Sequence, residues 1–219
     1  SYDYTLITDG SSITSSPTLI DNNILLSEAS LQMATEGVAM VHNLICGALT
    51  CVGGGTGPRY TPYHVPHRTE VAGFMTILHG DARFYNNIFV QKEIRQDLVD
   101  YARSQDCQKE YNFVCGTKPY DGYPSPEEYF SRFTAKTAVD HFGKDIYYDH
   151  LPVYTGGNLY FNGAQPYDGE AGAYVVEQQE ITLSLEEKDG AYVLKTNLYD
   201  LVPQMETSVI STELLGEAF

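Results

Sequence analysis

The chain has 219 residues, of which 42% are hydrophobic, and a formal net charge of −16. This length and apolar content suffice for a large domain with a buried core and exclude a disordered protein. The acidic balance argues against nucleic acids and anionic membranes, because both recruit clustered Lys and Arg. No apolar run predicts a membrane span. The first residues show no signal-peptide pattern, which leaves cytoplasmic and secreted or periplasmic locations open.

One short phrase recurs along the chain: an asparagine followed at once by apolar residues. Its four copies contain Asn23, Asn43, Asn87 and Asn158, at steps of 20, 44 and 71 residues. Twenty residues is about one turn of a parallel β-solenoid, in which short strands bury their apolar faces by stacking. Stacked asparagines can then hydrogen-bond from one turn to the next, about 4.8 Å away. Four unrelated strands that begin near a common turn residue are the alternative.

The repeat steps also predict where the stack is interrupted. Since 44 residues is about two turns, one additional turn is expected near residues 67–80. A Gly- and Pro-rich stretch at 51–67 comes before it and is typical of a long loop that leaves the solenoid.

A change of pattern after the third asparagine predicts a mostly helical insertion. Apolar residues recur at helical spacing from Ile94, and Ser125 with Glu128 forms a capping-box pattern at a helix start. We therefore expect residues 1–165 to be turns of a parallel β-helix, with the helical insertion at about residues 91–149.

The last part of the chain, residues 166–219, predicts an antiparallel β segment. Apolar residues alternate on both sides of a turn at Asp189-Gly190, and they are Ile181, Leu183, Leu185, Tyr192 and Leu194. This pattern is typical of a β-hairpin. The hairpin is expected to belong to a β-sandwich-like flank or to pack on the solenoid, so the predicted fold class is mainly β.

Metal and cofactor motifs are not evident in the sequence. The four cysteines are Cys46, Cys51, Cys107 and Cys115. They contain no C-x-x-C pair, so buried free thiols are favoured over a zinc site, with a disulfide between the last two as an alternative. His64 and His67 form a His-x-x-His pair, but no third ligand follows at helical spacing. There is no nucleotide-binding fingerprint, so neither a metal nor a cofactor is expected.

Carboxylates on neighbouring turns of such a stack would lie about 5 Å apart, the separation that retaining glycosidases use. Glu36 lies just before an apolar strand, but no acid occupies the matching place one turn earlier. One turn later Glu70 follows across the long loop, and two turns later the matching place is Gly80, which Asp81 follows. A solvated loop acid is the alternative for each of these residues.

Polar residues also gather just before Glu70. Neutral imidazoles beside an arginine suit sugar hydroxyls, and a polar surface loop is the alternative. The residues expected to bind a substrate are His42, His64, His67, Arg68 and Asp81.

Three long motifs carry a resemblance to a known family: PTLIDNNILLSEASLQMATEGVAMVHNLICG (17–47), TPYHVPHRTEVAG (61–73) and GDARFYNNIFV (80–90). Together they resemble glycoside hydrolase family 120, the β-xylosidases built on a right-handed parallel β-helix with a β-sandwich flank. The similarity runs from about Pro17 to Phe219. Family members have several hundred residues before the first motif, so this chain looks like the C-terminal part of such an enzyme, or a shortened relative.

The resemblance implies a retaining mechanism, with an aspartate nucleophile and a glutamate acid/base about one turn further on. The glutamate maps onto Glu36. The aspartate would fall near Thr14–Ser16, where this sequence reads ITSS and departs from the family. The nucleophile is then absent, supplied by another chain, or one of Asp21, Glu70 and Asp81. The residues predicted to be catalytic are Glu36, Glu70 and Asp21.

The function predicted from these motifs is a β-xylosidase-like glycoside hydrolase acting on the non-reducing end of xylo-oligosaccharides by double displacement. Another chain or a homo-oligomer is considered as the partner that completes the β-helix. A non-catalytic carbohydrate-binding β-helix is the first alternative, because the expected nucleophile is missing. A polysaccharide lyase, which would need a basic proton acceptor, and a purely structural solenoid follow.

Overall fold

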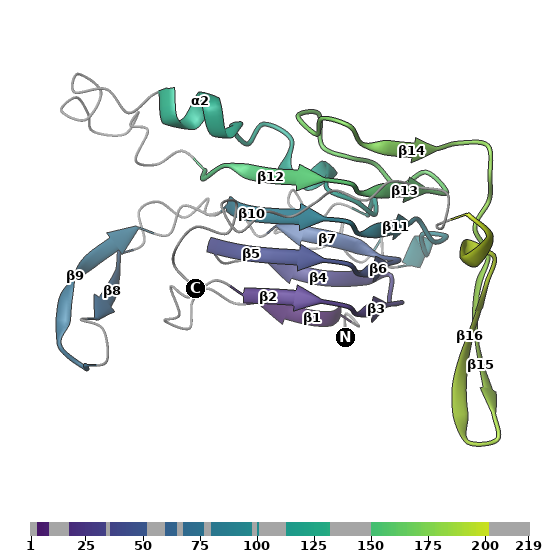
Figure 1. Ribbon diagram of the computed structural model, residues 1–219. Coiled ribbons are helices and arrows are strands. Elements are labelled where there is room, and N and C mark those ends of the chain that lie inside the picture. Colours follow the sequence, from purple (N-terminus) through teal and green to yellow (C-terminus); the bar gives the residue numbers. More distant parts are fainter. Residues whose placement is uncertain are drawn as a thin grey trace.

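The structure is a computed structural model, and it describes residues 4–8, 18–33, 36–51, 60–64, 68–76, 80–97, 100, 113–131 and 150–201. Strands dominate these residues, and most strands run parallel to their neighbours (Figure 1). No helix in this part of the chain is long and apolar enough to cross a membrane.

The stacked strands form three parallel sheets. The first sheet contains β1 (Tyr4–Thr8), β4 (Ala29–Met33) and β7 (Ala48–Cys51). The second contains β2 (Thr18–Asp21), β5 (Glu36–Val41), β10 (Gly80–Tyr85) and β12 (Val153–Gly156). The third contains β3 (Ile24–Leu25), β6 (Leu44–Ile45), β11 (Ile88–Val90), β13 (Leu159–Phe161) and β14 (Tyr174–Val176).

The chain visits these three sheets in rotation. β1, β2 and β3 are followed by β4, β5 and β6, and β7 then returns to the first sheet. Because each of these passes adds one strand to each sheet, the strands stack in a β-helix-like arrangement. The mainly β class with parallel sheets therefore agrees with the prediction from the repeat.

Side chains from equivalent positions form columns in the core. Ile20, Met40 and Phe84 are in register across the second sheet. Phe89 and Tyr160 are in register across the third, with ring centroids 5.0 Å apart and nearly parallel planes. All five side chains are buried, and burying a large apolar side chain contributes about 1.5–3 kcal/mol. The repeat in the sequence thus becomes a continuous core.

The recurring asparagines form a ladder at the corner between the second and third sheets. The backbone N–H groups of Asn23, Asn43 and Asn87 each donate at 3.0 Å to Oδ1 of the next asparagine. The side-chain Nδ2 atoms also donate along the ladder, from Asn43 to Asn87 at 3.0 Å and from Asn87 to Asn158 at 3.1 Å. The predicted hydrogen bonding from turn to turn is confirmed.

The step of 44 residues is one turn of the stack and not two. β10 pairs directly with β5, so that Gly80 lies opposite Glu36. The prediction of an additional turn near residues 67–80 is therefore wrong. The intervening chain leaves the stack, and in it β8 (Tyr60–His64) and β9 (Val71–Thr76) form an antiparallel hairpin that stands away from the sheets (Figure 1).

The predicted helical insertion at 91–149 lies largely outside the described residues. Its described part contains η2 (Lys118–Tyr120) and α2 (Pro126–Ser131). The predicted capping box is confirmed, because the N–H of Ser125 donates to Glu128 Oε2 at 2.8 Å and the N–H of Glu128 donates to Ser125 Oγ at 3.2 Å.

The antiparallel hairpin predicted near the C-terminus consists of β15 (Leu183–Lys188) and β16 (Ala191–Thr196). Its turn residues Asp189 and Gly190 have φ values of 54° and 78°, a left-handed conformation that suits an Asp-Gly turn. η4 (Leu198–Asp200) follows. Figure 1 shows the hairpin projecting beyond the end of the sheets.

Apolar contacts at the base of this hairpin tie it to the third sheet. Ile181 and Leu198 are buried in one cluster with Val90 and Phe161. The expected division of the chain between residues 165 and 166 stays a prediction. Parallel pairing itself continues past it, because β14 pairs with β13.

Two of the four cysteines, Cys46 and Cys115, are buried free thiols, as favoured from the sequence. Burial raises the pKa of Cys46 to about 12 and also raises the pKa of Cys115. Cys107 lies outside the described residues. Neither of the two buried thiols is therefore a reactive nucleophile at neutral pH.

Candidate functional site

The candidate site lies where β5 and β10 begin side by side in the second sheet. Glu36 opens β5, and its register partner Gly80 opens β10. Asp81 follows Gly80, so the two acids belong to adjacent strands and differ by one residue in register. The expectation that Gly80 and Asp81 lie two turns from Glu36 is wrong, since one turn separates them.

Backbone geometry fixes the position of Asp81. Gly80 has a φ of 102°, and a Cβ atom there would lie 2.2 Å from the carbonyl oxygen of Leu151, so only glycine fits. Asp81 has a φ of 49°, a left-handed conformation that aspartate tolerates better than most residues. The chain therefore bends into β10 at these two residues. They lie at the same end of the strands as Glu36, the first residue of β5.

Arg83 binds the Asp81 carboxylate on the outer face of the second sheet. Its Nη2 donates to Asp81 Oδ1 at 3.0 Å, and the exposed fractions of the two side chains are 19% for Arg83 and 36% for Asp81. The guanidinium carbon also lies 5.3 Å from the centroid of the Tyr154 ring. Ala82 and Phe84 are buried on the opposite face of β10. Strand alternation thus places Arg83 outside the core.

Burial and charge act in opposite directions on this carboxylate. Burial raises the pKa of Asp81, and the charge and hydrogen bond of Arg83 lower it, with burial the larger effect. The pKa of Tyr154 is also raised, chiefly by burial and secondly by the negative charge of Asp81. The arrangement therefore offers a half-buried carboxylate held by a cation, beside an aromatic ring.

Asp21, a predicted catalytic residue, lies at the other end of the second sheet. It closes β2 and is in register with Val41, the last residue of β5. Val41 lies five positions after Glu36 along the strand, which is a distance of roughly 17 Å. Asp21 is exposed and accepts a hydrogen bond from Asn22 at 3.0 Å. The structure does not bring Asp21 to Glu36.

Residues of the polar cluster lie on or beside the β8–β9 hairpin. His64 ends β8, opposite Val71. Arg68 and Glu70 lie in the connection before β9, where both are exposed and 3.8 Å apart. This hairpin stands away from the sheets (Figure 1). His67 lies outside the described residues. The roles predicted for these residues stay predictions.

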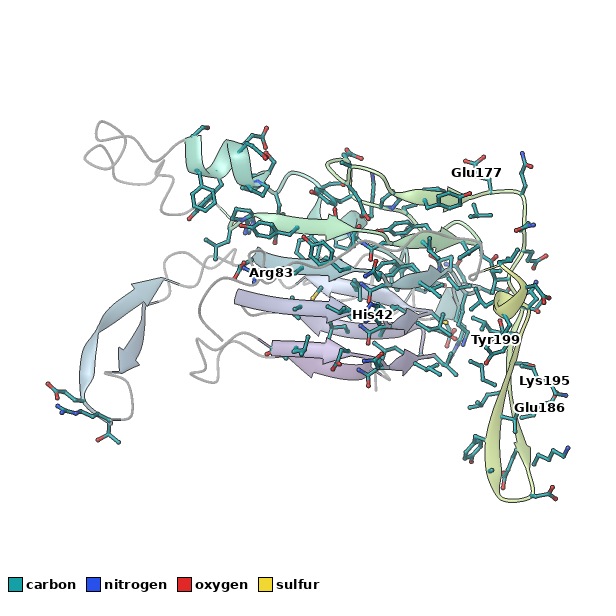
Figure 2. The ribbon with its side chains drawn as sticks, in the orientation of Figure 1. His42, Arg83, Glu177, Glu186, Lys195 and Tyr199 are labelled. Atoms are coloured by element: carbon teal, nitrogen blue, oxygen red, sulfur yellow. The ribbon has the colours of Figure 1, made fainter. Side chains whose placement is uncertain are left out.

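His42 occupies a tight turn at the corner of the stack. Its φ of 56° matches those of Asn22 and Asn86, each of which also precedes a ladder asparagine. His42 is exposed, and its Nε2 lies 3.3 Å from Asn86 Nδ2. Figure 2 shows His42 and Arg83 toward opposite ends of the second sheet. The position of His42 is that of a turn residue, and its predicted role in substrate binding stays a prediction.

A second half-buried carboxylate, which the sequence reasoning missed, ends the asparagine ladder. Glu170 Oε1 accepts from Asn158 Nδ2 at 2.9 Å, and Oε2 accepts from the Tyr160 hydroxyl at 2.6 Å and from Thr117 at 3.0 Å. Burial raises the pKa of Glu170, and these hydrogen bonds lower it by less. Because every donor around it is a structural residue of the stack, we assign Glu170 to the end of the ladder and not to a site.

A concavity of about 840 Å³ lies on the other side of the molecule, between the start of the insertion and the segment before β15. Two of its amide side chains, those of Asn162 and Gln91, are already engaged by the backbone. Asn162 both donates to and accepts from Ile181 at 2.8 Å, and Gln91 accepts from the N–H of Cys115 at 2.7 Å. Lys92 donates to a backbone carbonyl. This concavity is therefore a weaker candidate than the start of β5 and β10.

Arg83 and Tyr154 are site residues that the sequence analysis did not find. The alternation of Ala82 and Phe84 around Arg83 was a usable signal for its outward position. No signal connected Arg83 with Tyr154, because that contact depends on the step of 71 residues between stacked positions. Among the described residues, no group of three or more His, Cys, Asp or Glu side chains is arranged to hold a metal ion.

The fold resembles a solved structure described as the complex of XylC with xylose. The TM-score is 0.64, the sequence identity is 31%, and the likeness covers 90% of this chain and 28% of that chain. The chain thus spans a little over a quarter of the length of XylC. No protein-family model matches the chain, and no curated protein matches it. The likeness supports a related, mainly β fold with parallel sheets.

Proposed function

We propose that this chain is part of a β-xylosidase-like glycoside hydrolase that acts on the non-reducing end of xylo-oligosaccharides. The observation that carries the proposal is the placement of Glu36 and Asp81 on adjacent strands, with Gly80 opposite Glu36. Carboxyl groups about 5–5.5 Å apart are those of a retaining glycosidase. The likeness to XylC, whose solved structure contains xylose, supports a pentose as the sugar.

The proposed reaction is a double displacement with Glu36 as acid/base and Asp81 as nucleophile. Glu36 donates its proton to the glycosidic oxygen while an oxygen of Asp81 forms an ester bond to the anomeric carbon, and the shortened saccharide leaves. Glu36 then takes a proton from water, which displaces the ester, releases xylose and restores the Asp81 carboxylate. This assignment differs from the prediction from the sequence, in which Asp21 and Glu70 were the catalytic partners predicted for Glu36.

The finer features of the fold belong to the same proposal. We take the stack to be a right-handed, closed parallel β-helix with the C-terminal hairpin in a β-sandwich-like flank. Because the chain spans 28% of the length of XylC, further coils or a second chain would complete the substrate cleft.

The test compares substrates that differ in leaving group. Glu36→Gln should lower kcat/KM on xylobiose by about 100-fold to 10,000-fold, because the poor leaving group needs an acid. The same variant should lose much less on a dinitrophenyl β-xyloside, whose leaving group needs no proton. Asp81→Asn should abolish turnover of both substrates.

Matched controls are Asp21→Asn and Glu70→Gln, which remove one carboxylate each away from the proposed pair. Both should keep kcat/KM within about threefold of the parent chain. The proposal fails if Glu36→Gln loses equally on both substrates, or if Asp81→Asn retains turnover.

A second candidate is a non-catalytic carbohydrate-binding β-helix. The observation that favours it is the ITSS sequence at residues 13–16, where the resemblance implies an aspartate. This candidate predicts calorimetric binding of xylose or xylobiose, which Arg83→Gln weakens, without release of xylose from any substrate.

A further inference from the structure

We infer that Arg83 is a positioning residue that orients the Asp81 carboxylate at the start of β10, with the Tyr154 ring holding the guanidinium in place. The inference rests on the proposed function for its catalytic consequence. Its structural part concerns three side chains, on β10 and β12, whose contacts are independent of any substrate.

The geometry constrains Arg83 from two sides. Nη2 donates to Asp81 Oδ1 at 3.0 Å, and the guanidinium carbon lies 5.3 Å from the Tyr154 ring centroid. Arg83 and Tyr154 are register partners on adjacent strands, so the sheet itself sets the spacing between them. Since Oδ1 is held by Arg83, Oδ2 is the oxygen available to a substrate.

The surrounding charges make Arg83 the counter-ion for this carboxylate. Among the described side chains, Arg83 on the same strand acts on Asp81, and Asp81 in turn acts on Tyr154 of β12. Tyr85 is influenced by Arg83 and Tyr154, and Tyr154 also by Glu127. Arg83 is the cation among them. Without it, burial would favour the protonated, non-nucleophilic form of Asp81.

Arginine and lysine substitutions separate charge from geometry at this site. Lysine keeps the positive charge but has neither the planar fork that grips a carboxylate nor the flat group that stacks on a ring. Arg83→Lys should therefore keep Asp81 ionised while misplacing it, and Arg83→Gln should fail in both respects. Tyr154→Leu removes the ring face against which the guanidinium lies and should resemble Arg83→Lys.

The first experiment titrates Asp81 by carbon NMR on aspartate-labelled protein without substrate, with Asp81→Asn assigning the signal. The Asp81 pKa should rise in Arg83→Gln and change less in Arg83→Lys. Arg95→Gln is the matched control, because Arg95 pairs with Asp97 at the same sequence separation but on an exposed segment. An unchanged Asp81 titration in Arg83→Gln overturns the inference, and urea unfolding of each variant verifies that it is folded.

The second experiment measures hydrolysis of the aryl xyloside by the same variants. Arg83→Lys should lower kcat about 100-fold with little change in KM, as expected when a reacting group is misplaced by about 1 Å. Full activity in Arg83→Lys overturns the positioning role. If the parent chain shows no hydrolysis, the proposed function fails, and the NMR titration still decides whether Arg83 sets the state of Asp81.

Discussion

At the scale of single residues, Glu170 makes the stability of the stack depend on pH, because a carboxylate ends the hydrogen-bond ladder. Its two oxygens accept three hydrogen bonds inside the stack, yet burial raises its pKa above the ordinary value of 4.5. The folded state therefore binds a proton more readily than the unfolded state. The stability that follows is present below the ordinary glutamate pKa and is lost as the pH rises through the raised pKa.

Glu170→Gln should remove this pH dependence. The amide oxygen can still accept from Asn158, and the amide nitrogen can donate to the Thr117 or Tyr160 oxygen, without a buried charge. Urea unfolding at acidic and neutral pH should show that the variant gains stability relative to the parent chain as the pH rises. Glu170→Ala should instead lose about 1–3 kcal/mol at both pH values, because it leaves donors unpaired. An unchanged slope in Glu170→Gln would contradict the prediction.

Residue-level prediction from the sequence succeeded where a local pattern was enough. The pattern around Glu36 indicated an acid at the start of an apolar strand, and β5 does begin there. The pairing of Glu36 with Gly80 depends on register, which a single strand does not encode. Arg83 and Tyr154 were missed for the same reason, because their contact joins strands that are far apart in sequence.

At the scale of elements, the asparagine ladder is what fixes the register of the stack. Asn87 is fully buried, accepts from the backbone and side chain of Asn43, and donates to the Met40 carbonyl at 2.8 Å. A shift of one residue would bury these groups without partners, a cost of about 1–3 kcal/mol for each. The ladder therefore selects one alignment of neighbouring coils.

Replacing one rung of the ladder should therefore destabilise the stack according to its burial. Asn87→Ala should lower the free energy of unfolding by roughly 3 kcal/mol or more, because several buried groups lose their partners. Asn23→Ala is the control, since Asn23 is the exposed end of the ladder and should cost under about 1 kcal/mol. Equal losses in urea unfolding would show that the ladder does not carry the register.

The sequence predicted these elements because the asparagine phrase is both local and repeated. It misjudged the number of turns, because it treated the sequence step as a measure of axial distance. Steps of 20, 44 and 71 residues all correspond to one coil. The extra residues belong to chain that leaves the stack and returns to the next strand, which no count of residues reveals.

At the scale of the whole molecule, the stack is continuous and the additions lie at its sides. β5 pairs with β10, and β10 with β12, across all the intervening chain. The β8–β9 hairpin and α2 lie beside the sheets and not between them (Figure 1). The core columns are therefore built without residues from β8 or β9.

Replacing residues 60–76 with a short Gly-Ser linker should leave the stack folded. The cost of closing a loop changes by only about 0.6 kcal/mol for each doubling of its length, and β5 and β10 keep their pairing. Circular dichroism and urea unfolding should match the parent chain within about 1 kcal/mol. Loss of the cooperative transition would show that the hairpin supports the coil.

The number of residues in one coil varies between coils, and this has a consequence for the evolution of such a protein. Because neighbours in space are set by coil order, insertions and deletions between coils can accumulate without moving Gly80 away from Glu36. The segments that leave the stack can change in sequence while the pairing of the stacked strands stays the same. A chemical partner for an existing side chain can thus be recruited from a remote part of the gene, provided that its strand occupies the next coil.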